Sequence, residues 1–277
     1  MTTRTILITG ASSGIGQDAA LTLHARPGWR VIATCRKADD VARLGDLGIE
    51  TLALEMTDPD SIAAAWSETL ERTNGRLDAL FSNAGHGLPG AVEDVPTGAL
   101  RSIFETNVIA LHDLTRRAVQ VMRAQGHGRI VQHSSGLGLV SMRWRGAYNA
   151  SKHALEGLTN TLRQELNGTG IFVSTLNTGP VSSSFRVNSI AHFERWIDWE
   201  NSAIADRYKT ELLPHLYQPG PRAAFQREPS AVTRRLIHAI ESPRPRPRYL
   251  ITPATHIAEG FRRLLPQRLM DEIARRV

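Results

Sequence analysis

The chain has 277 residues, of which 41% are hydrophobic and 22% are charged, as is ordinary for a folded globular protein. The formal net charge is +6, but no dense basic block precedes the C-terminal fifth, which argues against a nucleic-acid partner. The single cysteine, Cys35, excludes an intramolecular disulfide and offers no metal cluster. No apolar run reaches the roughly eighteen residues that a membrane span needs, so we expect a cytoplasmic protein without a metal.

Apolar runs of strand length alternate with stretches of helical periodicity along the chain. The predicted strands cover residues 4–9, 29–34, 50–54, 78–82, 129–133, 171–176 and 247–252. The predicted helices cover residues 14–26, 38–47, 60–73, 99–125, 147–168 and 229–241. This alternation is typical of a parallel sheet with helices on both faces. It predicts an α/β fold of the doubly wound, Rossmann type, with a single domain over residues 1–277.

A glycine-rich turn follows the first predicted strand and precedes the first predicted helix. It reads Thr9-Gly10-Ala11-Ser12-Ser13-Gly14-Ile15-Gly16. Glycines let the backbone turn tightly and approach a pyrophosphate, whose negative charge is favoured at the N-terminus of a helix. The turn therefore predicts dinucleotide binding by Gly10, Ser12, Ser13, Gly14, Ile15 and Gly16.

The end of the second predicted strand carries Arg36 and Lys37, where enzymes that prefer NAD place an acidic residue against the ribose. An acid would repel a 2′-phosphate, whereas a guanidinium binds it with paired donors. We therefore hypothesise that the cofactor is NADP(H) rather than NAD(H). The alternative is that both cations only line a solvated strand end.

Tyr148 and Lys152 are four residues apart on a predicted helix, which stacks the phenol and the ammonium on one face. A tyrosine has an ordinary pKa of about 10, and a nearby cation favours its phenolate. Ser135 precedes Tyr148 by thirteen residues. This combination predicts acid–base chemistry at Tyr148.

With the glycine-rich turn, Ser82-Asn83-Ala84-Gly85, Ser135, Tyr148 and Lys152 in this order, the chain resembles the short-chain dehydrogenase/reductase family over residues 4–180. The resemblance implies a seven-stranded parallel sheet, a nicotinamide cofactor, carbonyl–alcohol interconversion, and a homodimer or homotetramer. Thr178-Gly179-Pro180-Val181 is similar to the hydroxysteroid and retinol dehydrogenase branch and to bacterial aldehyde reductases. Glu55 stands where the family usually has Asp beside the adenine. The further cofactor-binding residues that the resemblance implies are Glu55, Met56, Asn83, Ala84, Gly85, Tyr148, Lys152, Gly179, Pro180, Val181 and Ser183.

The resemblance also implies catalytic roles. Ser135 would hold the substrate carbonyl oxygen, and Tyr148 would exchange a proton with it. Lys152 would lower the pKa of the phenol and hold the nicotinamide ribose. Asn107 would position a water that reloads the proton, although it is also consistent with a structural role at a helix bend. A nucleotide-sensing regulatory or scaffold protein on the same fold is the alternative function.

The segment 182–228 is rich in aromatic residues and too long for a plain connection, which predicts a substrate lid. The predicted substrate-lining residues are His86, Leu88, Leu137, Arg143, Trp144, Val181, Phe185 and the aromatic residues of 193–208. Their largely apolar character suits a small hydrophobic aldehyde or ketone. Aromatic residues in such a pattern are more often part of a core or a dimer interface than of a pocket. We expect His86 and His133 to pack or hydrogen-bond locally rather than to act in catalysis.

Residues 243–277 predict a last strand and an arginine-rich amphipathic tail that Pro266 interrupts. Such a segment is suited to contact with an anionic membrane surface. Packing on its own domain or on a partner subunit is the preferred interpretation.

Overall fold

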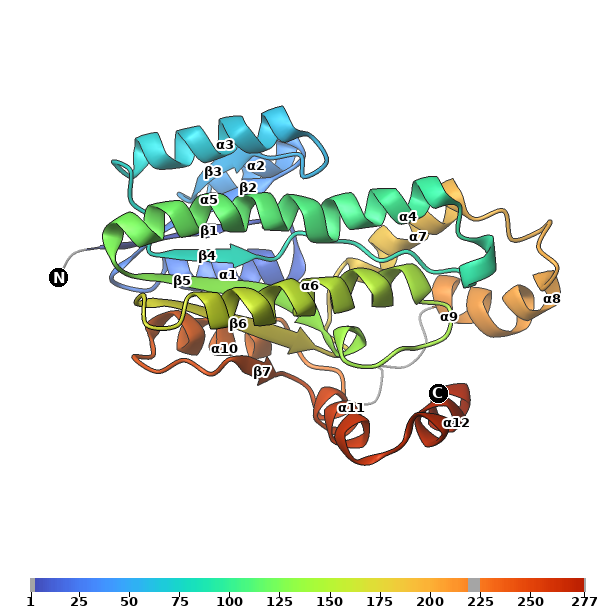
Figure 1. The fold of residues 1–277 in the computed structure, drawn as a ribbon. Helices are drawn as coiled ribbons and strands as arrows, with labels where there is room; N and C mark the ends of the chain where they lie inside the picture. Colours follow the sequence, from blue (N-terminus) through green and yellow to red (C-terminus); the bar gives the residue numbers. More distant parts are fainter. Residues whose placement is uncertain (1–2, 219–224, 277) are drawn as a thin grey trace.

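A computed structural model describes residues 3–218 and 225–276. Seven parallel strands form one sheet in the order β3-β2-β1-β4-β5-β6-β7 (Figure 1). The strands are β1 (Arg4–Ile8), β2 (Trp29–Cys35), β3 (Glu50–Ala53), β4 (Ala79–Ser82), β5 (Gly128–Ser135), β6 (Ile171–Thr178) and β7 (Arg248–Leu250). The predicted strands and the doubly wound fold are confirmed.

Helices cover both faces of this sheet and enclose two apolar cores. On one face lie α1 (Gly14–His24), α2 (Ala38–Gly45) and α10 (Ser230–Glu241). On the other lie α3 (Pro59–Arg72), α5 (Ala110–Gln125) and α6 (Gly146–Glu165). Strands such as β4, buried along their whole length, are apolar without alternation because both of their faces are covered.

The strand order reverses between β1 and β4, which pair in parallel with Ile8 opposite Phe81. In doubly wound sheets the crevice beyond the carboxyl ends of the strands at such a reversal is where ligands bind. The glycine-rich turn leaves β1 at this point, and Asn83-Ala84-Gly85 leaves β4 beside it. The topology therefore brings these two predicted cofactor-binding segments together.

The predicted helix over residues 99–125 is interrupted. It consists of α4 (Thr97–Phe104), a π-helical turn (Glu105–Ile109) and α5. The π turn contains Asn107, whose side chain is fully buried. A π-helical turn contains one extra residue, so the side chains that follow it are rotated about the helix axis. Such turns occur frequently at functional sites. Sequence periodicity alone did not reveal this break.

The segment 182–228 consists of short helices joined by irregular stretches, and its residues 219–224 lie outside the described part. It contains α7 (Phe185–Trp196), α8 (Ala205–Arg207), a π-helical turn (Tyr208–Leu212) and α9 (Leu213–Tyr217). These elements lie beyond the arrowheads of β4 and β6 (Figure 1). They share a third apolar cluster with Leu88, Ala147 and Tyr148, so the segment packs against the predicted catalytic residues.

The tail forms α11 (Pro253–Leu264) and α12 (Gln267–Arg276), which are separated at Pro266 as predicted. Glu259 anchors α11 because its carboxylate accepts bonds from Arg262 and Arg263 and lies 3.5 Å from Arg248. Within residues 3–218 and 225–276, no helix has the length and apolarity to cross a bilayer.

Candidate functional site

The glycine-rich turn is fixed to the segment that follows β4. The hydroxyl of Thr9 accepts hydrogen bonds from the backbone N–H groups of Asn83 (2.9 Å) and Ala84 (3.0 Å). The Asn83 amide donates in return to the carbonyls of Thr9 and Gly10, both at 3.0 Å. Gly10 has φ +67° and a Cβ there would lie 2.9 Å from the Ala84 Cα, so the turn requires glycine at this position.

The start of α1 suits an anionic ligand. Its N-cap residue, Ser13, makes no side-chain capping bond, so the first backbone N–H groups of the helix are not satisfied in that way. A Cβ on Gly16 would lie 2.2 Å from the Gly10 carbonyl oxygen, which shows how closely the helix approaches the turn. Ile15 is buried, and a Cβ on Gly14 would lie 3.0 Å from the Cβ of Ser183. These features fit the pyrophosphate of a dinucleotide.

Arg36 and Lys37 are exposed directly after β2. The Arg36 guanidinium lies 3.9 Å from the Glu55 carboxylate, and its side chain is 67% exposed. Met56 is buried beside Glu55. Arg36 is therefore held loosely at the edge of the crevice, where its donors remain available to a ligand.

His133 lies half-buried on β5, between Asn83 and Thr178. Its Nδ1 lies 2.9 Å from the Asn83 amide oxygen and its Nε2 lies 3.1 Å from the Thr178 hydroxyl. Burial and the Lys152 charge lower the pKa of His133 to about 3, so the ring is neutral. The expectation that His133 hydrogen-bonds locally is confirmed, and its role is to fix Asn83.

Asn107 fixes the backbone of His86. Its amide oxygen accepts from the His86 N–H at 3.0 Å, and its nitrogen donates to the His86 carbonyl at 2.9 Å and to the Ser151 hydroxyl at 3.1 Å. Both amide hydrogens thus have protein partners, and one lone pair of the oxygen remains for a water. These contacts give Asn107 a structural role, and its predicted role in holding a water stays a prediction.

Tyr148 is buried near the N-terminus of α6, and Ser135 ends β5 beside it. Burial raises the pKa of Tyr148 to about 12, while a hydrogen bond with Ser135 and the charge of Arg145 lower it partially. The sequence predicted that Lys152 would favour the phenolate. Instead burial dominates, and the opposing groups are Ser135 and Arg145.

Lys152 lies one turn after Tyr148, with its Nζ 5.8 Å from the centre of the phenol ring. The ammonium donates to the His133 carbonyl at 2.8 Å. Burial lowers the pKa of Lys152 to about 8, and the charge of Glu156 opposes this shift. The lysine is therefore close to the midpoint of its titration in the neutral to mildly alkaline range, which suits a group that passes protons.

Lys152 should cost the protein stability at neutral pH. Its pKa falls from 10.5 to about 8 on folding, so the unfolded chain binds more protons between these values and stability rises with pH there. We expect Lys152→Met to raise the free energy of unfolding by on the order of 2 kcal/mol near neutral pH. The gain should shrink above pH 8 and vanish near pH 10.5. Urea denaturation of this variant and of the exposed control Lys209→Met, across that range, tests this expectation.

A buried carboxylate is linked by hydrogen bonds to the predicted catalytic residues. Glu156, one turn after Lys152 on α6, accepts from the Asn177 amide at 2.6 Å and from the Arg248 guanidinium at 2.7 Å. Asn177 also donates to the Ser135 carbonyl at 3.1 Å. Sequence reasoning missed this set, whose only signal was an acid four residues after a predicted catalytic lysine.

Helix α7 covers the predicted catalytic residues. The ring of Phe185 meets that of Tyr148 edge to face at 5.3 Å between centres. His192 stacks on His86 at 3.6 Å, and burial lowers the pKa of His86 to about 4. A Cβ on Gly87 would lie 2.6 Å from the Ser189 hydroxyl, so the contact between α7 and this loop depends on a glycine.

The structure brings most predicted substrate-lining residues together but not all. Leu88, Leu137, Trp144 and residues of 193–208 share the cluster that contains Tyr148. Val181 instead packs against the core on the α1 face. Arg143 is exposed and donates to the Glu211 carboxylate and to the Arg275 carbonyl, each at 3.0 Å. These contacts engage the Arg143 side chain, and its predicted role as a substrate-lining residue stays a prediction.

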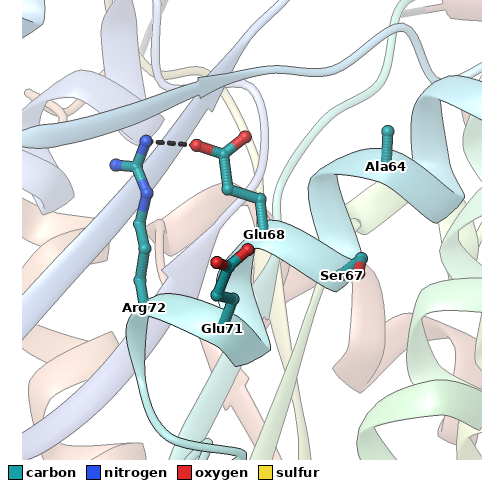
Figure 2. A pocket seen from close by; sticks show the side chains of 5 residues that line it. All are labelled: Ala64, Ser67, Glu68, Glu71 and Arg72. Atoms are coloured by element: carbon teal, nitrogen blue, oxygen red, sulfur yellow. Dashed lines mark hydrogen bonds and ion pairs between the residues drawn. The ribbon is translucent and has the colours of Figure 1, made fainter.

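Two hollows on the surface lie elsewhere. One lies along α3 and shows an ion pair between Arg72 and Glu68 (Figure 2). It is lined by Ala64, Ser67, Glu68, Glu71 and Arg72. The other lies between the start of α6 and α12, and includes Met142, Arg143 and Arg275. Neither is lined by Ser135, Tyr148 or Lys152.

Known proteins match this chain over most of its length. The family model described as short chain dehydrogenase matches residues 4–193. The oxidoreductase YbbO of Escherichia coli (strain K12), described as uncharacterized, is 37% identical over 98% of this chain and 93% of its own. Human 17-beta-hydroxysteroid dehydrogenase type 1 is 32% identical over 96% of this chain and 81% of its own. A short-chain dehydrogenase structure from Streptomyces avermitilis, 28% identical, superimposes with a TM-score of 0.79 over 94% of this chain and 92% of its own.

Proposed function

Since the chain belongs to the short-chain dehydrogenase family, we propose that it is an NADP(H)-dependent oxidoreductase that interconverts a carbonyl and an alcohol. One observation carries this proposal. Ser135, Tyr148 and Lys152 are buried together at the carboxyl end of the sheet, on the same side as the glycine-rich turn. A hydroxyl donor, a phenol and a lysine in this order supply what the reduction of a carbonyl needs from a protein.

The cofactor would be held by the crevice between β1 and β4. The N-terminus of α1 and the turn from Gly10 to Gly16 would bind the pyrophosphate. Arg36, with Lys37 beside it, would bind the 2′-phosphate, and Glu55 would lie by the adenine. Asn83, Gly85, Gly179 and Ser183 would flank the nicotinamide half, and Lys152 would hold its ribose. The bound nicotinamide supplies the hydride.

The side chains of this protein would then handle the proton and the developing charge. Ser135 donates a hydrogen bond to the carbonyl oxygen and holds it where negative charge forms. Tyr148 gives its proton to that oxygen, and Lys152, with a pKa of about 8, passes a replacement proton to the phenol. Arginine would not serve here because its charge is fixed.

The protonation of Tyr148 supports carbonyl reduction as the direction at neutral pH. Burial raises the pKa of Tyr148 to about 12, so the phenol carries its proton and is ready to donate it. Alcohol oxidation needs the phenolate instead, which becomes more abundant as pH rises.

We further propose that the described part of 182–228 is a substrate lid. Phe185 packs on Tyr148 and Ser189 packs on Gly87, so a substrate reaches the phenol only when α7 shifts. The residues around Tyr148 are largely apolar, which favours a substrate with a hydrophobic body.

The direct test is the loss of nicotinamide absorbance with NADPH and a panel of aldehydes, ketosteroids, retinoids and sugars. We expect turnover of at least one hydrophobic aldehyde or ketone, and faster turnover with NADPH than with NADH. Tight NADPH binding in a titration, combined with no turnover across the whole panel, would instead support a nucleotide-sensing role.

The cofactor preference should depend on Arg36. Hydrogen bonds to charged groups contribute about 1.5–3 kcal/mol, so Arg36→Leu should weaken NADPH binding by about 10–100-fold. NADH binding should hardly change, because NADH lacks the 2′-phosphate. Arg234→Leu, which removes an exposed arginine of α10, is the control. Equal loss of affinity for both cofactors in Arg36→Leu would contradict the assignment.

A further inference from the structure

Arg145 is a half-buried cation next to Tyr148 that has no acidic partner among the described residues. It precedes α6, three residues before Tyr148, so the two side chains are one helical turn apart. Its only side-chain hydrogen bond there is a long one, 3.5 Å to the carbonyl of Trp144. Burial lowers the pKa of Arg145, and its charge in turn lowers that of Tyr148.

Several other arginines have an acidic or aromatic partner, although the Nε atoms of Arg129 and Arg248 lack a hydrogen-bond partner in the described part of the chain. Arg143 and Arg207 both bond to Glu211, and Arg248 lies between Glu156 and Glu259. Arg129, whose pKa burial also lowers, stacks on the ring of Phe172 at 4.3 Å and donates to two backbone carbonyls. Arg145 differs from these because, within residues 3–218 and 225–276, it pairs with neither an acid nor an aromatic ring.

A partly desolvated guanidinium without a counterion is costly, and a bound anion recovers that cost. Its planar fork of donors matches a carboxylate or a phosphate with two parallel hydrogen bonds. Leu88 and Leu137 share an apolar cluster with Tyr148, and Phe185 packs on its ring, so the surroundings of Tyr148 are largely hydrophobic.

Resting on the proposed function, we infer that the substrate is a carbonyl compound with an apolar chain and an anionic group, and that Arg145 binds this group. The contact places the carbonyl at Tyr148 and makes Arg145 a specificity-determining residue. Arg143, a predicted substrate-lining residue, already pairs with Glu211.

The test compares medium-chain ω-oxo carboxylic acids with their methyl esters, and includes a phosphorylated ketone, with NADPH as reductant. We expect the wild-type protein to prefer the acids by about 10–100-fold in kcat/KM, mainly through a lower KM. Arg145→Met should abolish this preference and Arg145→Lys should keep part of it. Arg143→Met, two residues away, should leave it intact. A preference confined to the phosphate would identify that anion as the ligand of Arg145.

The acid-to-ester ratio separates recognition from an effect on Tyr148. Loss of the Arg145 charge raises the pKa of Tyr148 for every substrate alike, so it shifts the pH profile but leaves the ratio unchanged. No anion preference in the wild-type protein, or the same preference in Arg145→Met, would overturn the inference while leaving the reductase function standing. If no carbonyl compound is turned over, the anion site is tested by measuring Tm with a non-reacting alkanoate in the presence of NADP⁺. A rise of Tm in the wild-type protein that Arg145→Met lacks supports the anion site, and equal Tm values reject it.

Discussion

Replacing Tyr148 with phenylalanine is expected to lower kcat by about 10²–10⁴-fold, because the ring stays and only the proton-donating hydroxyl is lost. The ring packs in the apolar cluster and against Phe185, contacts that phenylalanine preserves. NADPH affinity should change little. The measurement is single-turnover reduction of the best aldehyde from the panel, with fluorescence titration of the cofactor.

Tyr217→Phe is the matched control, because Tyr217 is half-exposed on α9 and its hydroxyl bonds to Glu194 at 3.0 Å. This control should keep near-normal turnover. A Tyr148→Phe protein that folds, binds NADPH and turns over at a rate close to the wild type would show that another group supplies the proton.

The strands and the order of the site motifs could be predicted from the sequence because each depends on local pattern. Runs such as Ala79-Leu80-Phe81 are buried on both faces, so their apolar composition alone identifies them as strands. On a helix, a spacing of four residues places Tyr148 and Lys152 on the same face, and the structure has both residues on α6. These features need no knowledge of tertiary contacts.

The remaining features depend on contacts between distant segments. The inference that Arg145 rather than Arg143 meets an anion depends on Glu211, which lies on a later segment and pairs with Arg143. The π turn around Asn107 could not be predicted either, because Asn107 hydrogen-bonds to the backbone of His86, which is distant in the sequence. The pKa of Tyr148 likewise depended on burial beneath α7, which no spacing in the sequence reveals.

Glu156 is the buried charge on which several site residues depend. Its two oxygens accept from Asn177 and Arg248, and its charge raises the pKa of Lys152. Removing one partner of a buried ion pair costs about 3–5 kcal/mol, and we expect the lower end of this range because Arg248 keeps a second acid, Glu259, at 3.5 Å. We therefore expect Glu156→Gln, which keeps the size of the side chain, to lower the free energy of unfolding by about 3 kcal/mol. Glu165→Gln, exposed on the same helix, should be neutral.

The same variant should change the pH dependence of activity. Without the Glu156 carboxylate, burial lowers the pKa of Lys152 below about 8, so the ammonium loses its proton at lower pH and the alkaline limb of kcat moves downward. The double variant Glu156→Gln/Arg248→Met should regain part of the stability, because it also removes the guanidinium that has lost its nearer acid. It should not regain the pH profile, because Lys152 still lacks its counterion. An unchanged profile in a destabilised Glu156→Gln protein would make Glu156 a purely structural residue, and unchanged stability would contradict the ion pair itself.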